Sequence, residues 1–224
     1  MGVWEEEKRA AAEEAAELVR DGMALGLGTG STVAHFLSVL ARRSSKVRCV
    51  ATSPATQRRA RELGLVVGPF QWRDRLDLAV DGADQVAPDL WLLKGGGGAH
   101  TRERVVAAAT ERFVVIVSPN KLVEMLGPPV PLEVLRFGLA ATLRHLSELG
   151  PVRVREAPPT PTGQVLVDYL GPVEDPPALA ARLQAVPGVL SHGLFGPELI
   201  SEVLVGRAGG GADMLSGSRS YGPT

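Results

Sequence analysis

Four short segments of this 224-residue chain combine glycine with residues that can bind anions or move protons. In chain order they are Gly26–Thr32, Asp81–Asp84, Lys94–Gly98 with Glu103 just beyond, and Ser118–Lys121. The segments follow short apolar runs that predict β-strands. Because open α/β sheets bind ligands at the carboxyl ends of their strands, the four segments are candidates for one ligand-binding edge.

The first segment, Gly26–Thr32, lies between a predicted strand and a predicted helix. Its glycines allow a tight turn, and the N–H groups of the helix start suit a phosphate together with the hydroxyls of Ser31 and Thr32. A P-loop would need a following Gly-Lys-Ser/Thr, which is absent. A dinucleotide site would need a third glycine where Ser31 stands, and an acid near Ala51–Ser53. We predict phosphate binding; the alternative is a helix capped by Ser31 or Thr32 after a glycine turn.

The second segment places Asp81 and Asp84 around Gly82 and Ala83, directly after the apolar run Leu76–Val80. Two carboxylates three residues apart can bind sugar hydroxyls, hold a metal or exchange protons. The alternative is an Asp-Gly turn in which the aspartate caps the backbone. The residues alone leave this choice open.

The third and fourth segments contain two of the chain's four lysines. Lys94 precedes the glycines Gly95–Gly98, a run that is costly to order unless its backbone lies against a ligand. Glu103 falls in the first turn of the next predicted helix, where a glutamate taken alone is more typical of capping or dipole pairing. Lys121 follows a predicted strand, and taken alone it is typical of a solvated surface lysine.

Strands and helices are expected to alternate in the first half of the chain, which is typical of a doubly wound, mainly parallel sheet. The expected strands are Met23–Gly26, Val47–Thr52, Leu65–Val67, Leu76–Val80, Leu90–Leu93 and Phe113–Val117, and the expected helices are 4–20, Val33–Arg43, Pro54–Leu63 and Thr101–Thr110. The fold class is therefore α/β. Residues 1–126 are expected to form the substrate-binding and catalytic domain, completed by 200–224.

The segment Gly127–Pro131 interrupts this alternation, and an α+β pattern follows it. The expected helices are Val134–Leu149 and Pro177–Val186, and the expected strands are Val152–Arg155, Gln164–Tyr169, Val189–Leu194 and Leu199–Val205. This pattern predicts a second, smaller domain over 127–199. The Gly- and Ser-rich tail from Gly206 is expected to be loosely held.

Composition excludes several classes of protein. The formal charge of −1 argues against a nucleic-acid partner. The absence of an apolar run near the ~20 residues of a membrane span, and of a hydrophobic region in Met1–Arg9, predicts a cytoplasmic protein without a membrane partner. The single Cys49 cannot form an intrachain disulfide. The four histidines, at positions 35, 100, 145 and 192, lack metal-ligand spacing, so we expect no metal.

The four motifs, in this order, resemble those of the A-type ribose-5-phosphate isomerases. Weaker similarity continues through Pro131–Val134, Gly163–Asp168 and Pro187–Val189, so it spans nearly the whole chain. The resemblance implies a Rossmann-like main domain and a ferredoxin-like α+β domain. It also implies interconversion of ribose 5-phosphate and ribulose 5-phosphate in the non-oxidative pentose phosphate pathway, without cofactor or metal, by a homo-oligomer (a dimer or tetramer).

Carried over by position, the resemblance makes Glu103 the proton acceptor, with Asp81, Asp84 and Lys94 as further catalytic residues. The residues implied to bind substrate are Thr29, Gly30, Ser31, Thr32, Asp81, Gly82, Ala83, Asp84, Lys94, Gly95, Gly96, Gly97 and Lys121. One departure from the family pattern is His100, before Thr101, which could alter the electrostatics of the glycine loop.

The chemistry of the residues agrees with this reaction. An aldose–ketose isomerase uses either a base and an enediolate or a metal-assisted hydride shift, and the lack of a His-rich cluster favours the base. Glu103 would take the proton from C2 and return it to C1. Lys94 and the Gly95–Gly97 amides are candidates to hold the oxyanion. Asp81 and Asp84 are candidates for hydroxyl proton transfer and ring opening, and which does which stays open.

Three other functions are weighed against the isomerase. A sugar-phosphate sensor would need residues for a DNA-binding domain, which this chain does not have to spare. An amino-sugar-phosphate deaminase would need a catalytic histidine near the acids, and a coenzyme A transferase would need a covalent glutamate and a longer chain.

Overall fold

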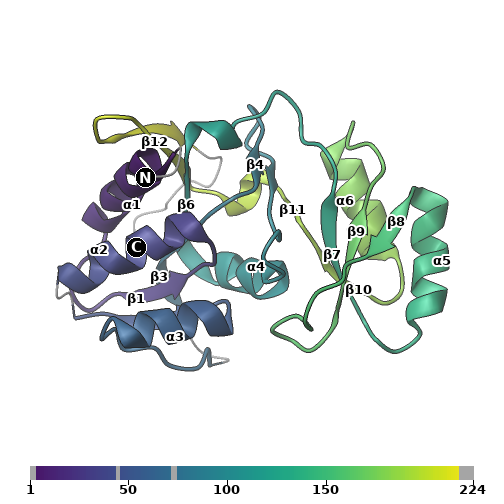
Figure 1. Cartoon of the computed structure of the whole chain (residues 1–224), viewed down its shortest axis with the longest axis horizontal. Helices are drawn as coiled ribbons and strands as arrows, with labels where there is room; N and C mark the ends of the chain where they lie inside the picture. Colours follow the sequence, from purple (N-terminus) through teal and green to yellow (C-terminus); the bar gives the residue numbers. More distant parts are fainter. Residues whose placement is uncertain (1–3, 44–45, 72–74, 217–224) are drawn as a thin grey trace.

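The computed structural model describes residues 4–43, 46–71 and 75–216, and a six-stranded sheet is its largest element (Figure 1). From edge to edge the strands are β13 (Ala212–Ser216), β12 (Glu202–Gly206), β6 (Thr110–Val117), β3 (Leu76–Asp81), β1 (Ala24–Leu27) and β2 (Arg48–Ala51). Neighbouring strands are parallel except β12 and β13. The expected α/β class with a mainly parallel sheet is confirmed.

Helices cover both faces of this sheet. They are α1 (Glu5–Glu17), α2 (Ser31–Arg42), α3 (Pro54–Glu62) and α4 (His100–Ala108). Alternate residues of β6 belong to different cores: Val114 and Ile116 pack with α1 and α2, whereas Val115 and Val117 pack on the side of α4. Since successive strand side chains point to opposite faces, a strand covered on both faces is apolar throughout.

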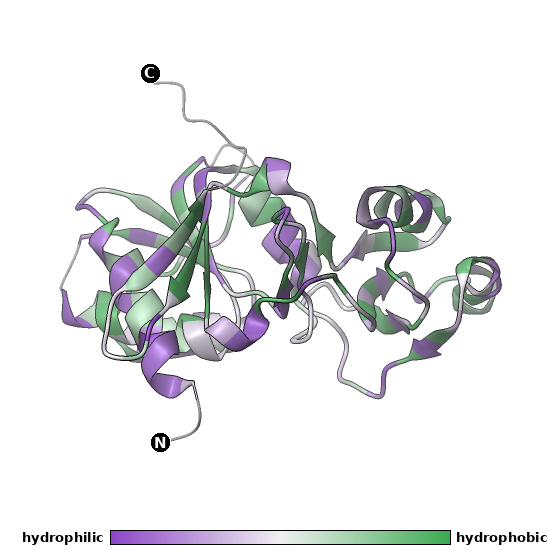
Figure 2. Ribbon diagram, turned by 90° about the horizontal axis from the view of Figure 1, so that it is seen from above, coloured by the Kyte–Doolittle hydropathy of each residue, from purple (hydrophilic) through white to green (hydrophobic). Residues whose placement is uncertain are grey.

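A smaller antiparallel sheet lies beside the large one, with two helices packed on it (Figure 1). Its strands are β10 (Val189–His192), β7 (Val130–Val134), β9 (Val165–Tyr169) and β8 (Val152–Val154), and its helices are α5 (Leu139–Leu149) and α6 (Pro176–Ala185). Figure 2 shows green, hydrophobic ribbon inside both parts and purple, hydrophilic ribbon mainly on the helices around them.

Short elements join the two parts. They are the strands β11 (Leu194–Phe195), β5 (Leu92–Leu93) and β4 (Gln85–Val86), which form a three-stranded sheet, and the 3₁₀ turns η1 (Pro119–Lys121) and η2 (Pro197–Leu199). The Lys94 N–H donates to the Gly193 carbonyl over 2.8 Å, which joins the end of β5 to the end of β10.

The expectation of a helix from Val134 is wrong at its start. Val130–Val134 forms strand β7, and the helix begins only at Leu139. Pro131 is unusual in such a strand, because proline cannot donate to a ladder. Nevertheless β7 pairs with β9 and β10 on its two sides. All five of its residues are buried, so packing outweighs the missing donor.

Three smaller expectations are also corrected. The tail from Gly206 is not loosely held over its described part, because Gly209–Gly211 have positive φ and turn the chain into β13, which pairs with β12. Leu65–Val67 forms only a single bridge, between Val67 and Cys49. The expected strand Leu199–Val205 begins at Glu202. Residues 217–224 of the predicted closing segment 200–224 lie outside the described residues.

Candidate active site

The site lies where the strand order of the large sheet reverses. After β1 the chain passes through α2 to β2 on one side, while β3 pairs with the other side of β1. Such a reversal leaves a crevice at the carboxyl ends of the two strands. Here the Gly28 N–H donates to the Val80 carbonyl over 2.9 Å, and a Cβ at Gly28 would clash with the Asp81 carboxylate. Glycine is therefore required at position 28.

The predicted phosphate loop ends in the uncapped start of α2. Gly30, with φ of 135°, is the N-cap residue, and no side chain caps the helix. The alternative in which Ser31 or Thr32 is the N-cap is therefore wrong. Ser31 and Thr32 line the pocket instead. The free N–H groups of a first turn and its positive dipole end favour an anion.

A buried cluster of three charges forms the floor of the site. The Lys94 ammonium lies 3.0 Å from Asp81 Oδ2 and 3.2 Å from Glu103 Oε2, and it donates to the Gly82 carbonyl. The three charged side chains are at most 5 % exposed. Asp81 Oδ1 also accepts from the N–H groups of Thr29, over 3.0 Å, and Gly82, over 2.8 Å. Asp81 thereby connects Lys94 to the ends of β1 and β3.

The cluster carries two potential negative charges and one positive charge, which changes the pKa of its members. Burial, and then the charge of Asp81, raise the pKa of Glu103 to about 8, although Lys94 opposes the rise. Burial lowers the pKa of Lys94, but the charges of Asp81 and Glu103 outweigh it and the net pKa is raised. Lys94 thus stays protonated, and Glu103 can gain or lose a proton near neutral pH.

The glycine loop is fixed against Asp84. The Gly96 N–H donates to Asp84 Oδ2 over 2.8 Å, and the Gly98 N–H donates to the Gly95 carbonyl over 3.0 Å. Gly95 and Gly98 have φ of 100° and 73°, a left-handed region that favours glycine. The conformation of the loop therefore depends on its glycines.

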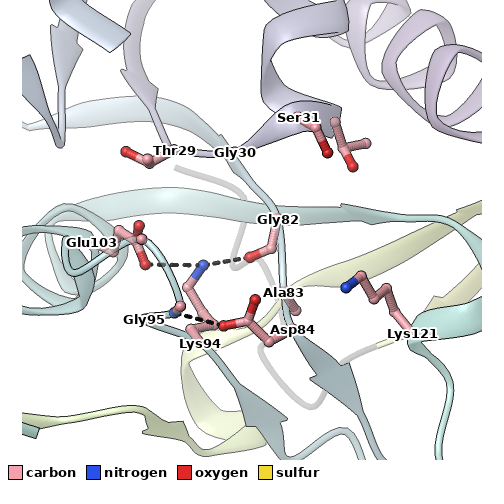
Figure 3. Close-up of a pocket in the computed structure, with 13 residues that line it drawn as sticks. Thr29, Gly30, Ser31, Gly82, Ala83, Asp84, Lys94, Gly95, Glu103 and Lys121 are labelled. Carbon is pink, nitrogen blue, oxygen red and sulfur yellow. Dashed lines mark hydrogen bonds and ion pairs between the residues drawn. The ribbon is translucent and has the colours of Figure 1, made fainter. Parts of the chain in front are cut away.

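The structure brings all of the predicted site residues together except Asp81, which lies beneath the pocket as the partner of Lys94. The lining residues are Thr29, Gly30, Ser31, Thr32, Gly82, Ala83, Asp84, Lys94, Gly95, Gly96, Gly97, Glu103 and Lys121. Figure 3 shows Glu103 and Lys121 entering this pocket from opposite sides. The pocket thus offers a proton-transferring group at one end and cationic or N–H donors at the other.

The residues that support this pocket from the small sheet were not predicted. Glu133 of β7 is fully buried and accepts from the hydroxyls of Thr101, Thr160 and Thr162, which ties the first turn of α4 to the small sheet. Asp168 of β9 is likewise buried. A sequence signal did exist, because each is a charged residue within an otherwise apolar strand.

His100 is buried beneath the glycine loop. Its Nδ1 would lie 2.7 Å from a Cβ at Gly95, and burial lowers its pKa to about 4. It is therefore a neutral packing residue near neutral pH. Within the described residues, no group of three or more His, Cys, Asp or Glu side chains is arranged to hold a metal ion. In the same residues, no helix is long and apolar enough to cross a membrane.

Comparison with known proteins gives one consistent result. The model of the family described as ribose 5-phosphate isomerase A (phosphoriboisomerase A) matches residues 48–210. Ribose-5-phosphate isomerase A of Nitrobacter hamburgensis is 47% identical over 205 residues, which cover 84% of this chain and 88% of that protein. The same enzyme of Gloeobacter violaceus is 46% identical over 215 residues, which cover 91% and 93%.

Solved structures agree. Ribose 5-phosphate isomerase A of Methanocaldococcus jannaschii superposes with a TM-score of 0.89 at 34% identity and covers 95% of this chain and 99% of its own. A D-ribose-5-phosphate isomerase solved in complex with phospho-erythronic acid gives a TM-score of 0.88 at 34% identity, with 96% and 100% covered.

Fold and similarity together define an aldose–ketose isomerase with a sugar-phosphate substrate. The chain belongs to the ribose 5-phosphate isomerase A family, and it interconverts ribose 5-phosphate and ribulose 5-phosphate.

Proposed function

We propose that the interconversion proceeds by proton transfer through an enediolate, with Glu103 as the base and no metal. The observation that carries the proposal is the carboxylate of Glu103, which lines the pocket and has a pKa raised to about 8. A general base is most effective when its pKa lies near the working pH. Glu103 takes the proton from C2 of the aldose and returns it to C1, so that one carboxylate serves both steps.

The negative charge that develops on the substrate oxygens needs donors on the pocket wall. The Lys94 ammonium already faces three oxygens, so it must release one of them to bind the substrate. The Gly96 N–H is engaged by Asp84. The Gly97 N–H has no acceptor among the residues that the structure describes, and Gly97 lines the pocket. We assign Gly97 N–H and Lys94 to the oxyanion.

The two aspartates take different roles in this scheme. Asp84 lines the pocket and can reach substrate hydroxyls, which suits ring opening and hydroxyl proton transfer. Asp81 lies beneath the pocket, where it holds Lys94 and the backbone of Thr29. Asp81 is thus a positioning residue, and Asp84 is the catalytic residue of the pair.

The phosphate is assigned to the opposite end of the pocket, against Ser31, Thr32 and Lys121. The start of α2 supplies N–H donors there, and Lys121 supplies a positive charge. Binding energy gained at this remote group positions the reacting carbons. Phospho-erythronic acid, the ligand of the related structure, has a carboxylate and a phosphate. These two groups correspond to the charged oxygens of the enediolate and to the phosphate of the substrate.

Four further expectations join the proposal. The catalytic unit comprises residues 1–126 and 200–224, and 127–199 form the ferredoxin-like unit. The enzyme acts as a homodimer or homotetramer in the cytoplasm, in the non-oxidative pentose phosphate pathway. Exposed apolar side chains, among them Met125 and Phe137, are candidates for burial between subunits. Light scattering on the purified enzyme measures the oligomer.

Isotope exchange tests the mechanism. Turnover of ribose 5-phosphate in D₂O should place deuterium on C1 of the ketose, because a proton held by Glu103 can exchange with water before its return. A chelator should leave the rate unchanged. Full retention of the substrate hydrogen, together with inactivation by a chelator that added metal reverses, would overturn the proposal and make Asp81 and Asp84 metal ligands.

A further inference from the structure

The glycine loop of the pocket is held from behind by an arginine of the small sheet. Arg155 follows β8 directly, and its Nη1 donates to the Gly96 carbonyl over 3.0 Å and to the Gly95 carbonyl over 3.4 Å. The contact joins residues about 60 positions apart in the sequence. It connects the small sheet directly to the loop that carries the proposed oxyanion donor.

The guanidinium is itself held in place. Its Nε and Nη2 donate to the two carboxylate oxygens of Asp168, the Nε over 3.3 Å. The Arg155 N–H donates to the Leu166 carbonyl over 2.9 Å, so backbone and side chain are both anchored on β9. The Asp168 side chain is 3 % exposed and the Arg155 side chain 21 %. A bidentate pair of this kind fixes the orientation of the guanidinium as well as its position.

The direction of the loop carbonyls determines the direction of the loop N–H groups. In a planar trans peptide, the C=O of one residue and the N–H of the next point in opposite directions. The Gly95 carbonyl faces Arg155, and the Gly96 N–H of the same peptide unit points to Asp84 on the other side. In the next unit the Gly96 carbonyl faces Arg155. The Gly97 N–H therefore points away from Arg155, on the side of the pocket.

We propose that Arg155, held by Asp168, is a positioning residue that aims the Gly97 N–H at the oxyanion of the enediolate. This inference rests on the proposed function. A positive charge on the carbonyl side also polarises the peptide unit and strengthens its N–H as a donor, as in other hydrogen-bonded chains. The small sheet thus takes part in the reaction without touching the substrate.

Three variants test this role. Arg155→Lys keeps a positive charge beside the buried Asp168, so the fold is retained, but an ammonium cannot reproduce the planar bidentate geometry. Arg155→Ala combined with Asp168→Asn removes the pair without leaving an unpaired buried carboxylate. The matched control is Arg153→Ala: Arg153 lies 3.5 Å from Asp168 but is 65 % exposed, and within the described residues it makes no hydrogen bond to the glycine loop.

The readouts are kcat, the KM for ribose 5-phosphate and the inhibition constant of 4-phosphoerythronic acid, whose carboxylate imitates the enediolate. Losing an oxyanion donor costs roughly 10²–10³ in rate, so a misdirected donor should lower kcat about 10- to 100-fold. The inhibition constant should rise by a similar factor, while KM and inhibition by inorganic phosphate change little. Arg153→Ala should match the wild type.

A structural role alone would give a different pattern. Partial unfolding lowers the apparent kcat but leaves the inhibition constant of the remaining folded enzyme unchanged, and that result would overturn the inference. Wild-type kcat in folded Arg155→Lys and in the double variant would overturn it as well. The proposed mechanism fails separately, when Glu103→Gln stays active or the wild type incorporates no deuterium and loses activity to a chelator.

Discussion

Two buried glutamates lie near the first turn of α4, and their surroundings differ. Glu103 belongs to that turn and is 4 % exposed, and Glu133 reaches it from β7 and is 0 % exposed. The Glu103 carboxylate faces the pocket, with a lysine and a second carboxylate for neighbours. The Glu133 carboxylate accepts from three threonine hydroxyls.

The difference shows that burial alone does not make a carboxylate reactive. The three hydroxyl donors hold the Glu133 carboxylate in place, and Glu133 is not among the residues that line the pocket. Around Glu103, burial and the charge of Asp81 oppose ionisation, and the pocket leaves the carboxylate open to substrate. The surroundings of Glu133 tie α4 to the small sheet, whereas those of Glu103 suit the proton transfer proposed for it. Four predictions, in order of decreasing effect, test this contrast and the assignment of the phosphate to the other end of the pocket.

The largest effect is expected for Glu103→Gln. Glutamine keeps the size of the side chain but cannot accept the substrate proton, so kcat should fall by roughly 10²–10⁴ with little change in KM. Steady-state kinetics with ribose 5-phosphate measure both constants. If the variant keeps most of its kcat, Glu103 is not the base. The two glutamates would then not differ in their role in catalysis.

At the other end of the pocket, Ser31→Ala should weaken substrate binding. A hydrogen bond to a charged group contributes about 1.5–3 kcal/mol, so binding of ribose 5-phosphate should weaken by about 10-fold or more. Unphosphorylated ribose should be affected little. The control is Ser38→Ala on the same helix, where the hydroxyl donates to the Ala34 carbonyl and is exposed. Equal losses for both sugars would mean that Ser31 stabilises only the helix.

The raised pKa of Glu103 should make the stability of the protein depend on pH. The pKa of Glu103 is about 8 in the folded protein, against 4.5 as its ordinary value. Between these values the folded state holds a proton that the unfolded state has lost, so the free energy of unfolding should fall as the pH rises. Denaturant titrations of the wild type from pH 5 to 9 should show this slope. A slope that persists unchanged in Glu103→Gln would assign it to another group.

The smallest catalytic effect is expected for Glu133→Gln. The amide keeps one acceptor oxygen, but its NH₂ group cannot accept a hydrogen bond, so the threonine hydroxyls beside it lose their acceptor. Unfolding should become easier by about 1–3 kcal/mol, while kcat changes by less than roughly tenfold. Thermal unfolding and steady-state kinetics on one preparation check both. A loss of kcat as large as that of Glu103→Gln would abolish the distinction between the two sites.

The sequence alone is sufficient to predict a property that depends only on residues close together in the chain. Glycines and donors at the end of a strand, as in Gly26–Thr32, are local features, and the structure places them at a sheet edge beside a helix start. The same holds for the α/β class, because most strands of the large sheet are apolar runs that can be recognised one by one. The family resemblance came from the order of these local motifs, and the comparisons confirm it.

Strand β7 shows where local patterns were insufficient. Val130–Val134 contains Pro131 and Glu133, and neither residue is typical of a buried central strand. Pairing with β9 and β10, and the threonine hydroxyls around Glu133, compensate for both. These partners are distant in the sequence, so local patterns predict no strand here and place the start of a helix at Val134.

By itself the sequence determined which chemical groups are available, and it placed them in loops that follow strands, because such turns and helix starts are encoded within a few residues. The tertiary structure decided the state of those groups. Burial and the charge of Asp81 raise the pKa of Glu103, whereas, against the opposing effect of burial, the charges of Asp81 and Glu103 raise the pKa of Lys94. The contact of Arg155 with the glycine loop joins residues about 60 positions apart. Charge interactions of this kind depend on distance in space and on exclusion of water, and neither can be derived from spacing along the chain.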